Sequence, residues 1–381
     1  MKTLLVEGWR GVHHSFALVN QHQLTHLAAT KRLQVFHADR PLFDPAWPQS
    51  QLGLEQQFGG RIRPLDASAP AAFDALYRVD FPFRLYGGPA RRVFVFGTSE
   101  TRTFPPGYLA YDEHGSGTGR VADSVEIVVP SEWSRTGFLE AGFDPDRVHV
   151  VPHGVEPIDY WHPDRDEKRE VRARLKLPGD TFVFLNIGAM TGNKGIAHLL
   201  VAFGRHRGRY PDSLLLLKGA EFLYRGQMEE RVREAKSIDP AATDAALGSI
   251  VYLGKDLSPE DLSTLYRAAD AYVSPYHAEG FNLPVLEAIA SGLPVIVTAG
   301  GPTDDFCRDE FALKIESRLV TQPDRLTKHL KPSVDSLVTH MSRAVDDAEF
   351  RRVAAIAGPE CAATQYSWRL VTERLARLVM T

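Results

Sequence analysis

The stretch DAYVSPYHAEGFNLPVLEAIASGLPVIV (residues 270–297) decides the fold. Short apolar runs stand near both of its ends, and a segment with helical spacing lies between them, before Gly292. This succession of strand, loop, helix and strand is the repeating unit of a parallel sheet, in which a helix connects two parallel strands. The stretch therefore predicts an α/β fold built from doubly wound parallel sheets.

The same alternation extends over nearly the whole chain. In the first half, strands are predicted at residues 3–7, 33–37, 75–81, 92–97, 126–130 and 148–152, and helices at residues 15–29 and 131–141. Ser15 and Ser131 are the expected helix caps. In the second half, the expected strands are FVFLNIG, SLLLLKG, SIVYLGK, AYVSPY and PVIVTAG, each followed by a helical stretch. The chain thus repeats one architecture twice.

The length indicates two domains, because 381 residues exceed the ~250–300 at which one core usually stops growing. The charged stretch VEPIDYWHPDRDEKREVRARLKLPGD, with three prolines, separates the two halves. We expect a first Rossmann-like lobe over residues 1–157, a linker with a surface helix over 158–180, a second lobe over 181–363 and a C-terminal helix over 364–381 that returns to the first lobe. Two such lobes would face one another across a cleft at the carboxyl ends of their strands.

The composition excludes several classes of protein. With 44% hydrophobic and 24% charged residues the chain can bury cores, and its net charge of −4 provides no basic arm for nucleic acid. Two cysteines cannot form a disulfide framework or a four-thiolate zinc site. The short apolar start, MKTLLVEGWRG, is unlike a signal peptide, and no apolar run is long enough to span a bilayer. These features predict a cytoplasmic protein.

Glu279 and Glu287 are separated by seven residues across the junction between a strand and a helix. If the helix begins near Asn282, its first turn offers backbone N–H groups and a positive dipole end that suit a diphosphate, and Pro284 fits that turn. Eight helical positions correspond to ~12 Å, about the span from a sugar across a diphosphate to a ribose. One glutamate could hold each end of a nucleotide sugar. Alternatively, both are exposed helix carboxylates.

The motif AEGFNLPVLEAIASGLPVIVT resembles the signature of the retaining glycosyltransferases of family 4, which are group 1 glycosyltransferases with the two-lobed GT-B fold. Further stretches resemble this family in the expected order: PSEWSRTGFLEAGF (130–143), VVPHGVEP (150–157), NIGAMTGNKG (186–195), VYLGKDLSPEDLSTLYRAADAYVSPY (251–276) and the Ser367-Trp368 pair. The resemblance covers most of the chain and is strongest over residues 126–305. It implies a glycosyltransferase with an α/β GT-B fold.

The resemblance also implies roles for individual residues. Glu279 and Lys194 would be catalytic: Glu279 would contact hydroxyls of the transferred sugar, and Lys194 would neutralise the diphosphate. Glu287 would bind the ribose. The implied donor site comprises Gly188, Lys194, Lys218, Gly254, Glu279, Gly280, Phe281, Asn282, Leu283 and Glu287.

One position departs from the family pattern. Many members have an arginine directly after the glycine of the phosphate loop, where this chain has Ala189. The diphosphate would therefore lack one positive partner. Lys218 and Lys255 each follow a strand and could contribute charge, although exposed lysines are common.

Residues of the first lobe are candidates for the acceptor or sugar side. In EGWRGVHHS, Gly8 and Gly11 could let the backbone approach a substrate, and His13 and His14 could contact acceptor or sugar. A plain tight turn with solvent-facing histidines explains this segment nearly as well. Glu100 follows another strand end, which makes it a further candidate.

Two pairs of acidic residues resemble metal-binding sequence motifs, but we expect no metal ion at either pair. Asp164 and Asp166 flank an arginine in the charged linker, where acids favour a helix start, and Asp304-Asp305 is similarly ambiguous. The GT-B resemblance implies that basic groups and a helix end replace an essential metal. His153, in PHGV, is expected to be structural.

The expected reaction is the transfer of a hexose from a GDP- or UDP-linked donor to a hydroxyl of a saccharide or lipid-linked acceptor, with retention, in polysaccharide biosynthesis. The nucleotide sugar would be a co-substrate, and no other cofactor is expected. A lipid-linked acceptor would bring the protein to the inner face of the membrane as a peripheral contact. A nucleotide-sugar epimerase and a non-catalytic nucleotide-sugar-binding protein are the alternatives. A nicotinamide oxidoreductase is disfavoured, because no Gly-X-Gly-X-X-Gly follows a strand. The sequence gives no indication of the oligomeric state.

Overall fold

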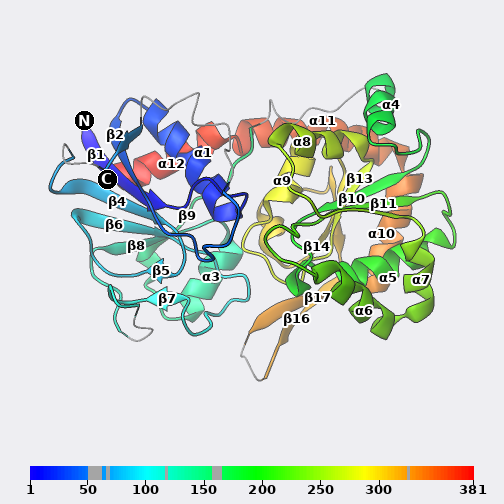
Figure 1. Cartoon of the computed structure of the whole chain (residues 1–381), viewed down its shortest axis with the longest axis horizontal. Helices are drawn as coiled ribbons and strands as arrows, with labels where there is room; N and C mark the ends of the chain where they lie inside the picture. The colour runs from blue at the N-terminus through cyan, green and yellow to red at the C-terminus, as the bar shows by residue number, and fades with distance from the viewer. Residues whose placement is uncertain (50–61, 66–68, 116–118, 157–164, 324–326) are drawn as a thin grey trace. The chain divides into compact units, whose positions relative to one another are not determined.

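The computed structural model describes residues 1–49, 62–65, 69–115, 119–156, 165–323 and 327–381 (Figure 1). The chain divides into two compact units. Unit 1 comprises Met1–Gly154, Pro323–Thr327 and Tyr366–Thr381, and unit 2 comprises Val155–Gln322 and Lys328–Gln365. Each unit has its own parallel sheet, so the α/β class predicted from the sequence is confirmed.

The sheet of unit 1 has the strand order β3-β2-β1-β4-β6-β8-β9, and neighbouring strands run parallel. Its strands are β1 Lys2–Gly8, β2 Leu33–Asp39, β3 Ile62–Pro64, β4 Phe73–Val79, β6 Ala90–Phe96, β8 Val125–Val129 and β9 Val148–Val150. The short strands β5 Phe83–Arg84 and β7 Leu109–Ala110 form a second sheet. The helices are α1 Ser15–Ala29, α3 Glu132–Glu140, the 3-10 turn η1 Pro145–Arg147 and α12 Trp368–Met380.

The two helix starts predicted in unit 1 differ in their caps. Ser131 caps α3 as predicted, because its hydroxyl accepts a hydrogen bond from the backbone N–H of Ser134 at 3.1 Å. The prediction for Ser15 is wrong: His14 has the extended backbone of a cap, and its Nδ1 accepts from the N–H of Phe16 at 3.3 Å. Ser15 is the first helical residue. The imidazole nitrogen thus takes the place of the expected hydroxyl oxygen.

The last helix, α12, packs in unit 1 against α1. His22 of α1 stacks on Trp368 with ring centroids 4.8 Å apart. Gly154 lies so close to the start of α12 that a Cβ there would be 2.7 Å from Trp368 Cα. The PHGV segment therefore needs its glycine for packing against this helix.

The sheet of unit 2 has the strand order β12-β11-β10-β13-β14-β15, again with parallel neighbours. Its strands are β10 Val183–Ile187, β11 Leu214–Lys218, β12 Ile250–Leu253, β13 Ala271–Ser274, β14 Val295–Thr298 and β15 Ala312–Ile315. The antiparallel hairpin β16 Ser317–Thr321 and β17 Lys328–Pro332 follows. The helices are α4 Arg165–Arg174, α5 Ile196–Arg207, α6 Gln227–Ile238, α7 Pro240–Leu247, α8 Pro259–Ala268, α9 Leu283–Ala290, α10 Val334–Asp346 and α11 Ala348–Gln365, with the 3-10 turns η3 Gly192–Lys194 and η4 Pro302–Asp305.

The expectation of a helix after every strand of the second half is wrong at β14. That strand is followed by the four-residue 3-10 turn η4, because Gly300 has a left-handed φ of 80° and Pro302 restricts the next turn. Five further parts of the fold were not predicted from the sequence: β3, β5, β7, β15 and the β16–β17 hairpin. These segments are short or polar, and the apolar-run criterion does not detect them.

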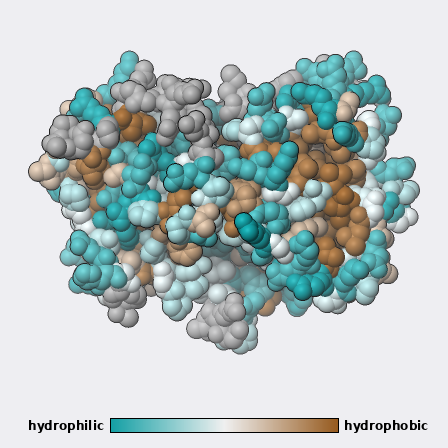
Figure 2. All heavy atoms as spheres, in the orientation of Figure 1, coloured by the Kyte–Doolittle hydropathy of each residue, from teal (hydrophilic) through white to brown (hydrophobic). Residues whose placement is uncertain are grey.

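Hydrophilic side chains cover much of the face drawn in Figure 2, with apolar atoms between them. Large hydrophobic residues that are more than a third exposed occur on both units, among them Phe43, Tyr108, Ile238 and Ile356. In the described part of the chain, no helix combines the length and the apolar character needed to cross a bilayer.

Candidate active site

The predicted donor residues of unit 2 follow two strands that are neighbours in the sheet but not in the sequence. From β10 the chain builds the sheet outward through β11 and β12, and then returns to place β13 on the other side of β10 (Figure 1). Loops that follow such a pair of strands diverge, and open α/β sheets bind ligands at this switch point. The loop after β10 contains Gly188 and Lys194, and the loop after β13 contains Glu279.

The backbones of the two loops are joined through Asn193. Its carbonyl oxygen accepts from the N–H groups of His277 at 2.7 Å and Ala278 at 3.2 Å. Its Nδ2 donates to the carbonyl oxygen of Ala278 at 3.2 Å. Gly195 brings the loops equally close, because a Cβ there would lie 1.9 Å from the carbonyl oxygen of Pro275. Asn193 was not among the predicted site residues, although it lies inside the NIGAMTGNKG motif.

Lys194 and Glu279 form an ion pair, with Nζ 2.5 Å from Oε1. The side chain of Glu279 is only 8% exposed, whereas that of Lys194 is 25% exposed. A buried carboxylate requires a charged or hydrogen-bonding partner, so the lysine stabilises the loop after β13 and is itself held in place by it. The two residues predicted to be catalytic are therefore brought together.

Helix α9 begins at Leu283, in agreement with the predicted start near Asn282, and Asn282 is its N-cap residue. Asn282 has the left-handed angles φ 80° and ψ 67°, and its Nδ2 donates to Ser274 Oγ at 2.9 Å. In the described structure its side chain therefore does not cap the helix, and the positive dipole end is not satisfied by a cap of its own. Glu279 lies in the loop before the helix, so the ~12 Å estimate, which counted helical positions from Glu279, does not apply.

Glu287 lies in the second turn of α9 and is half-buried. Its Oε2 accepts a hydrogen bond from the hydroxyl of the buried Tyr266 at 2.5 Å. The hydroxyl of Tyr272 donates to the carbonyl oxygen of Ile187 at 3.0 Å. Burial raises the pKa of Tyr272, and the negative charges of Glu287 and Glu279 act in the same direction. Both carboxylates therefore lie within electrostatic reach of one tyrosine. Neither tyrosine was predicted, since each stands in a run that indicates only core packing.

Lys218, at the end of β11, is buried rather than solvent-exposed. Burial lowers the pKa of Lys218 to about 8, and its Nζ lies 5.4 Å from the ring centroid of Phe222 and donates to the carbonyl oxygen of Gly219. Gly254 follows β12, and a Cβ there would lie 2.6 Å from Glu221 Cγ. Lys255 is exposed. Lys218 and Gly254 thus lie at the carboxyl edge of the sheet, one and two strands away from β10.

Three of the candidates in unit 1, Gly11, His13 and His14, lie after β1, which is also at a switch point because β1 stands between β2 and β4. Glu100 follows β6 instead. Gly11 has a left-handed φ of 70°, as a tight turn requires. His14 stacks on Trp47 with centroids 5.0 Å apart in addition to capping α1, and His13 is half-buried. The carbonyl oxygen of Glu100 accepts from Trp133 Nε1 at 3.0 Å, and its side chain is exposed. His14 therefore has a structural role, whatever else it contacts.

Gly8, at the end of β1, has a packing role. A Cβ at this position would lie 2.7 Å from the carbonyl oxygen of Val79 and 2.7 Å from Asn20 Nδ2. The close approach of these groups explains the glycine without a substrate.

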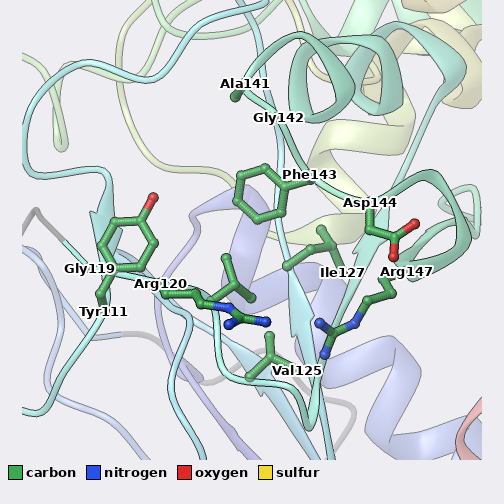
Figure 3. Close-up of a pocket in the computed structure, with 11 residues that line it drawn as sticks. Tyr111, Gly119, Arg120, Val125, Ile127, Ala141, Gly142, Phe143, Asp144 and Arg147 are labelled. Carbon is green, nitrogen blue, oxygen red and sulfur yellow. The ribbon is translucent and has the colours of Figure 1, made fainter.

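A cavity of about 440 Å³ lies elsewhere in unit 1 (Figure 3). Its wall includes Val125, at the amino end of β8, and the guanidinium groups of Arg120 and Arg147 both point into it. None of the described residues that line it is a predicted site residue. Because it lies at the amino end of the strand, it is separate from the switch point of unit 1.

The acidic pairs of the sequence analysis have structural partners where they are described. Asp164 lies outside the described residues, and Asp166 is in the first turn of α4. Asp304 accepts from the N–H of Gly300 at 2.7 Å and pairs with Lys314 at 3.2 Å. Over the described ranges, no group of three or more His, Cys, Asp or Glu side chains is arranged to hold a metal ion.

Comparison with known protein families identifies the chain. A family described as "Glycosyl transferases group 1" matches residues 167–357, which is half of the chain and includes both loops of the site. The chain belongs to the group 1 glycosyltransferases. This group 1 chain is 26% identical over 253 residues to the lipopolysaccharide 1,2-N-acetylglucosaminetransferase of Salmonella typhimurium. That match covers 66% of the chain and 61% of the relative.

Solved structures show the fold of this group 1 glycosyltransferase. Sucrose-phosphate synthase from Thermosynechococcus elongatus superposes with a TM-score of 0.68 at 17% identity, covering 100% of this chain and 98% of that protein. Anabaena HepE in complex with UDP and glucose gives a TM-score of 0.68 at 13% identity, with 100% of both chains covered. The predicted GT-B fold is confirmed.

Proposed function

We propose that this protein transfers a hexose from a nucleoside diphosphate sugar to a hydroxyl of a saccharide or lipid-linked acceptor, with retention of the anomeric configuration, as a family 4 enzyme. The observation that carries the proposal is the Lys194–Glu279 pair, 2.5 Å long, at the amino end of α9 and at the switch point of a parallel sheet. The name of the Salmonella relative describes the transfer of a hexosamine, and the Anabaena structure contains UDP and glucose. UDP- and GDP-linked hexoses are therefore the donors to test.

The charges of the site suit the departure of a nucleoside diphosphate. Negative charge grows on the leaving phosphate in the transition state, and in the proposed complex Lys194 and the positive end of α9 stabilise it. The Lys194–Glu279 pair and the start of α9, which the side chain of Asn282 does not cap, support this assignment. In the proposed complex, Glu279 contacts hydroxyls of the transferred sugar, and Glu287, held by Tyr266, contacts the ribose. These groups provide the charge stabilisation without an essential metal.

Retention follows from attack on the face that the leaving group vacates. As the bond from the anomeric carbon to the phosphate oxygen breaks, the acceptor oxygen bonds to that carbon, and its proton passes to the departing phosphate oxygen. A double displacement would require a carboxylate beneath the anomeric carbon. Glu279 is committed to Lys194, which favours the first route.

Polysaccharide biosynthesis in the cytoplasm, at the inner face of the membrane, is part of the same proposal. Cys307 and Cys361 are buried free thiols, as a reducing compartment permits.

The test is to incubate the protein with UDP- and GDP-hexoses and a panel of saccharide and lipid-linked acceptors. We expect release of the nucleoside diphosphate that depends on the acceptor, and a product whose anomeric configuration, measured by NMR, equals that of the donor. Donor binding without turnover would support a non-catalytic binding protein, and isomerisation without acceptor would support an epimerase. A covalent sugar adduct on a carboxylate would refute front-face attack.

A further inference from the structure

An arginine from α6 lies behind the loop that follows β10. A Cβ on Gly192, the first residue of η3, would lie 2.8 Å from Nη1 of Arg231. The side chain of Arg231 is 8% exposed, so its guanidinium is packed against the turn that carries Lys194. A Cβ at position 192 would therefore displace the guanidinium from its present position against the turn.

The charge of Arg231 also reaches the loop after β13. His277, whose N–H donates to Asn193, has its pKa lowered to about 3, mainly by burial, and Arg231 is among the positive groups that lower it further. The arginine therefore contributes positive potential to both loops of the site. Its ion-pair partners are Glu230 at 2.8 Å and Glu234 at 2.9 Å.

These two glutamates neutralise Arg231 only in part. Their side chains are 52% and 40% exposed, so water screens their charge, whereas the guanidinium is buried against the loop. The Nε of Arg231 is buried without a hydrogen-bond partner among the described residues. Leaving a charged group incompletely paired is costly, and an anion near the loop would offset this cost.

Ala189, in the same loop, cannot supply such a charge, because its side chain is a methyl group. The family resemblance implies an arginine at this position in many members. We infer that Arg231 supplies, from behind the loop, the positive charge that Ala189 cannot, and holds the Gly192–Lys194 turn in place for a nucleoside diphosphate. This inference rests on the proposed function. Arg231 is thus a positioning and electrostatic residue that deepens the donor site.

The experiment compares variants that change shape and charge separately. Arg231→Met removes the charge and keeps most of the volume, Arg231→Lys keeps the charge, and Arg233→Met is the matched control on the exposed face of the same helix. The affinities of nucleoside diphosphate (UDP or GDP) and of the corresponding nucleoside are measured by calorimetry. We expect Arg231→Met to weaken diphosphate binding about tenfold, to leave nucleoside binding unchanged and to make diphosphate binding less sensitive to salt. Arg231→Lys and Arg233→Met should stay within about threefold of the parent.

A rescue distinguishes charge from packing. Ala189→Arg placed in the Arg231→Met background should restore most of the diphosphate affinity. The inference is overturned if Arg231→Met and Arg231→Lys weaken binding equally, if nucleoside and diphosphate weaken together, or if Ala189→Arg does not rescue.

A folding failure of Arg231→Met and a failure of the proposed function can be distinguished from a failure of the inference. If Arg231→Met does not fold, the variant Glu230→Gln/Glu234→Gln keeps the arginine, removes its counter-charges and should tighten diphosphate binding; unchanged or weaker binding would overturn the inference. If the parent protein binds neither nucleoside diphosphate, the proposed function fails first.

Discussion

Breaking the Lys194–Glu279 pair tests the centre of the site. At 2.5 Å and an effective dielectric constant of ~20, the two charges attract by roughly 7 kcal/mol before the cost of removing them from water. Removing one partner of a buried pair costs ~3–5 kcal/mol, and the 25% exposure of Lys194 places this pair near the lower end. We expect Lys194→Met to lower the free energy of unfolding by about 3 kcal/mol, because it leaves Glu279 buried and unpaired.

The double variant Lys194→Met/Glu279→Gln separates stability from catalysis. It should recover most of the stability, because no unpaired charge remains, giving a coupling of about 2 kcal/mol in the cycle. Its kcat/KM should remain at least about tenfold below the parent, like that of each single variant, which corresponds to ~1.4 kcal/mol of transition-state stabilisation. Urea unfolding and the rate of nucleoside diphosphate release measure the two effects. Unchanged kcat/KM in the single variants would refute the site, and recovery of activity together with stability would show that the pair is only structural.

Three further predictions concern single groups. Glu287→Gln should raise the Kd of the nucleotide about tenfold with less change in kcat, and Tyr266→Phe should have a smaller effect of about 1 kcal/mol; equal affinities in calorimetry would contradict the ribose contact. Gly195→Ala should lower the free energy of unfolding by more than ~3 kcal/mol, because the new Cβ meets a backbone carbonyl oxygen at 1.9 Å. Gly226→Ala is the control: it has the same φ of 69° but open space around it, so it should cost only ~1–2 kcal/mol. Similar melting temperatures for the two variants would argue against the clash. Burial lowers the pKa of His153 to about 3, so the stability that its neutral form provides is complete above pH ~6.5 and is lost as the pH falls toward 3. Between pH 7 and 5.5 the free energy of unfolding should fall by about 1 kcal/mol. Thermal unfolding of His153→Asn should show a correspondingly weaker pH dependence.

The strands of both sheets were largely predictable because they are buried on both faces. Runs such as FVFLN and LLLLK contain few polar residues, and their positions agree with β10 and β11 within two residues. The start of α9 was predictable for a different reason, since Pro284 favours the first turn of a helix, where its missing N–H costs nothing. The hairpin β16–β17 was not predictable from apolar runs, because its strands, SRLVT and KHLKP, are mostly polar and partly exposed.

The site was predictable to the extent that its residues lie on the strand-end loops. Lys194 and Glu279 are 85 residues apart, and the order of apolar runs alone does not show that β13 pairs with β10 rather than with β12. The family resemblance, and not the order of the strands, indicated that Lys194 and Glu279 belong to one site. Tyr266 and Tyr272 could not be found in this way, because the bonds from their hydroxyls depend on side-chain packing behind the loops.

The role of Arg231 also could not be predicted from the sequence. At Ala189 the family resemblance implies a missing charge, but nothing in the local sequence pattern identifies which residue replaces it. The replacement comes from α6, one of several helices with exposed basic residues. Arg231 differs from its exposed neighbour Arg233 in being buried and in lying so close to Gly192 that a Cβ added there would be 2.8 Å from its Nη1. Since the loop is fixed at its other side by Asn193, an arginine pressing on Gly192 restrains the turn between two supports. The position of Lys194 therefore depends on contacts from both sides of the loop, and an alanine at position 189 need not abolish the positive potential of the site.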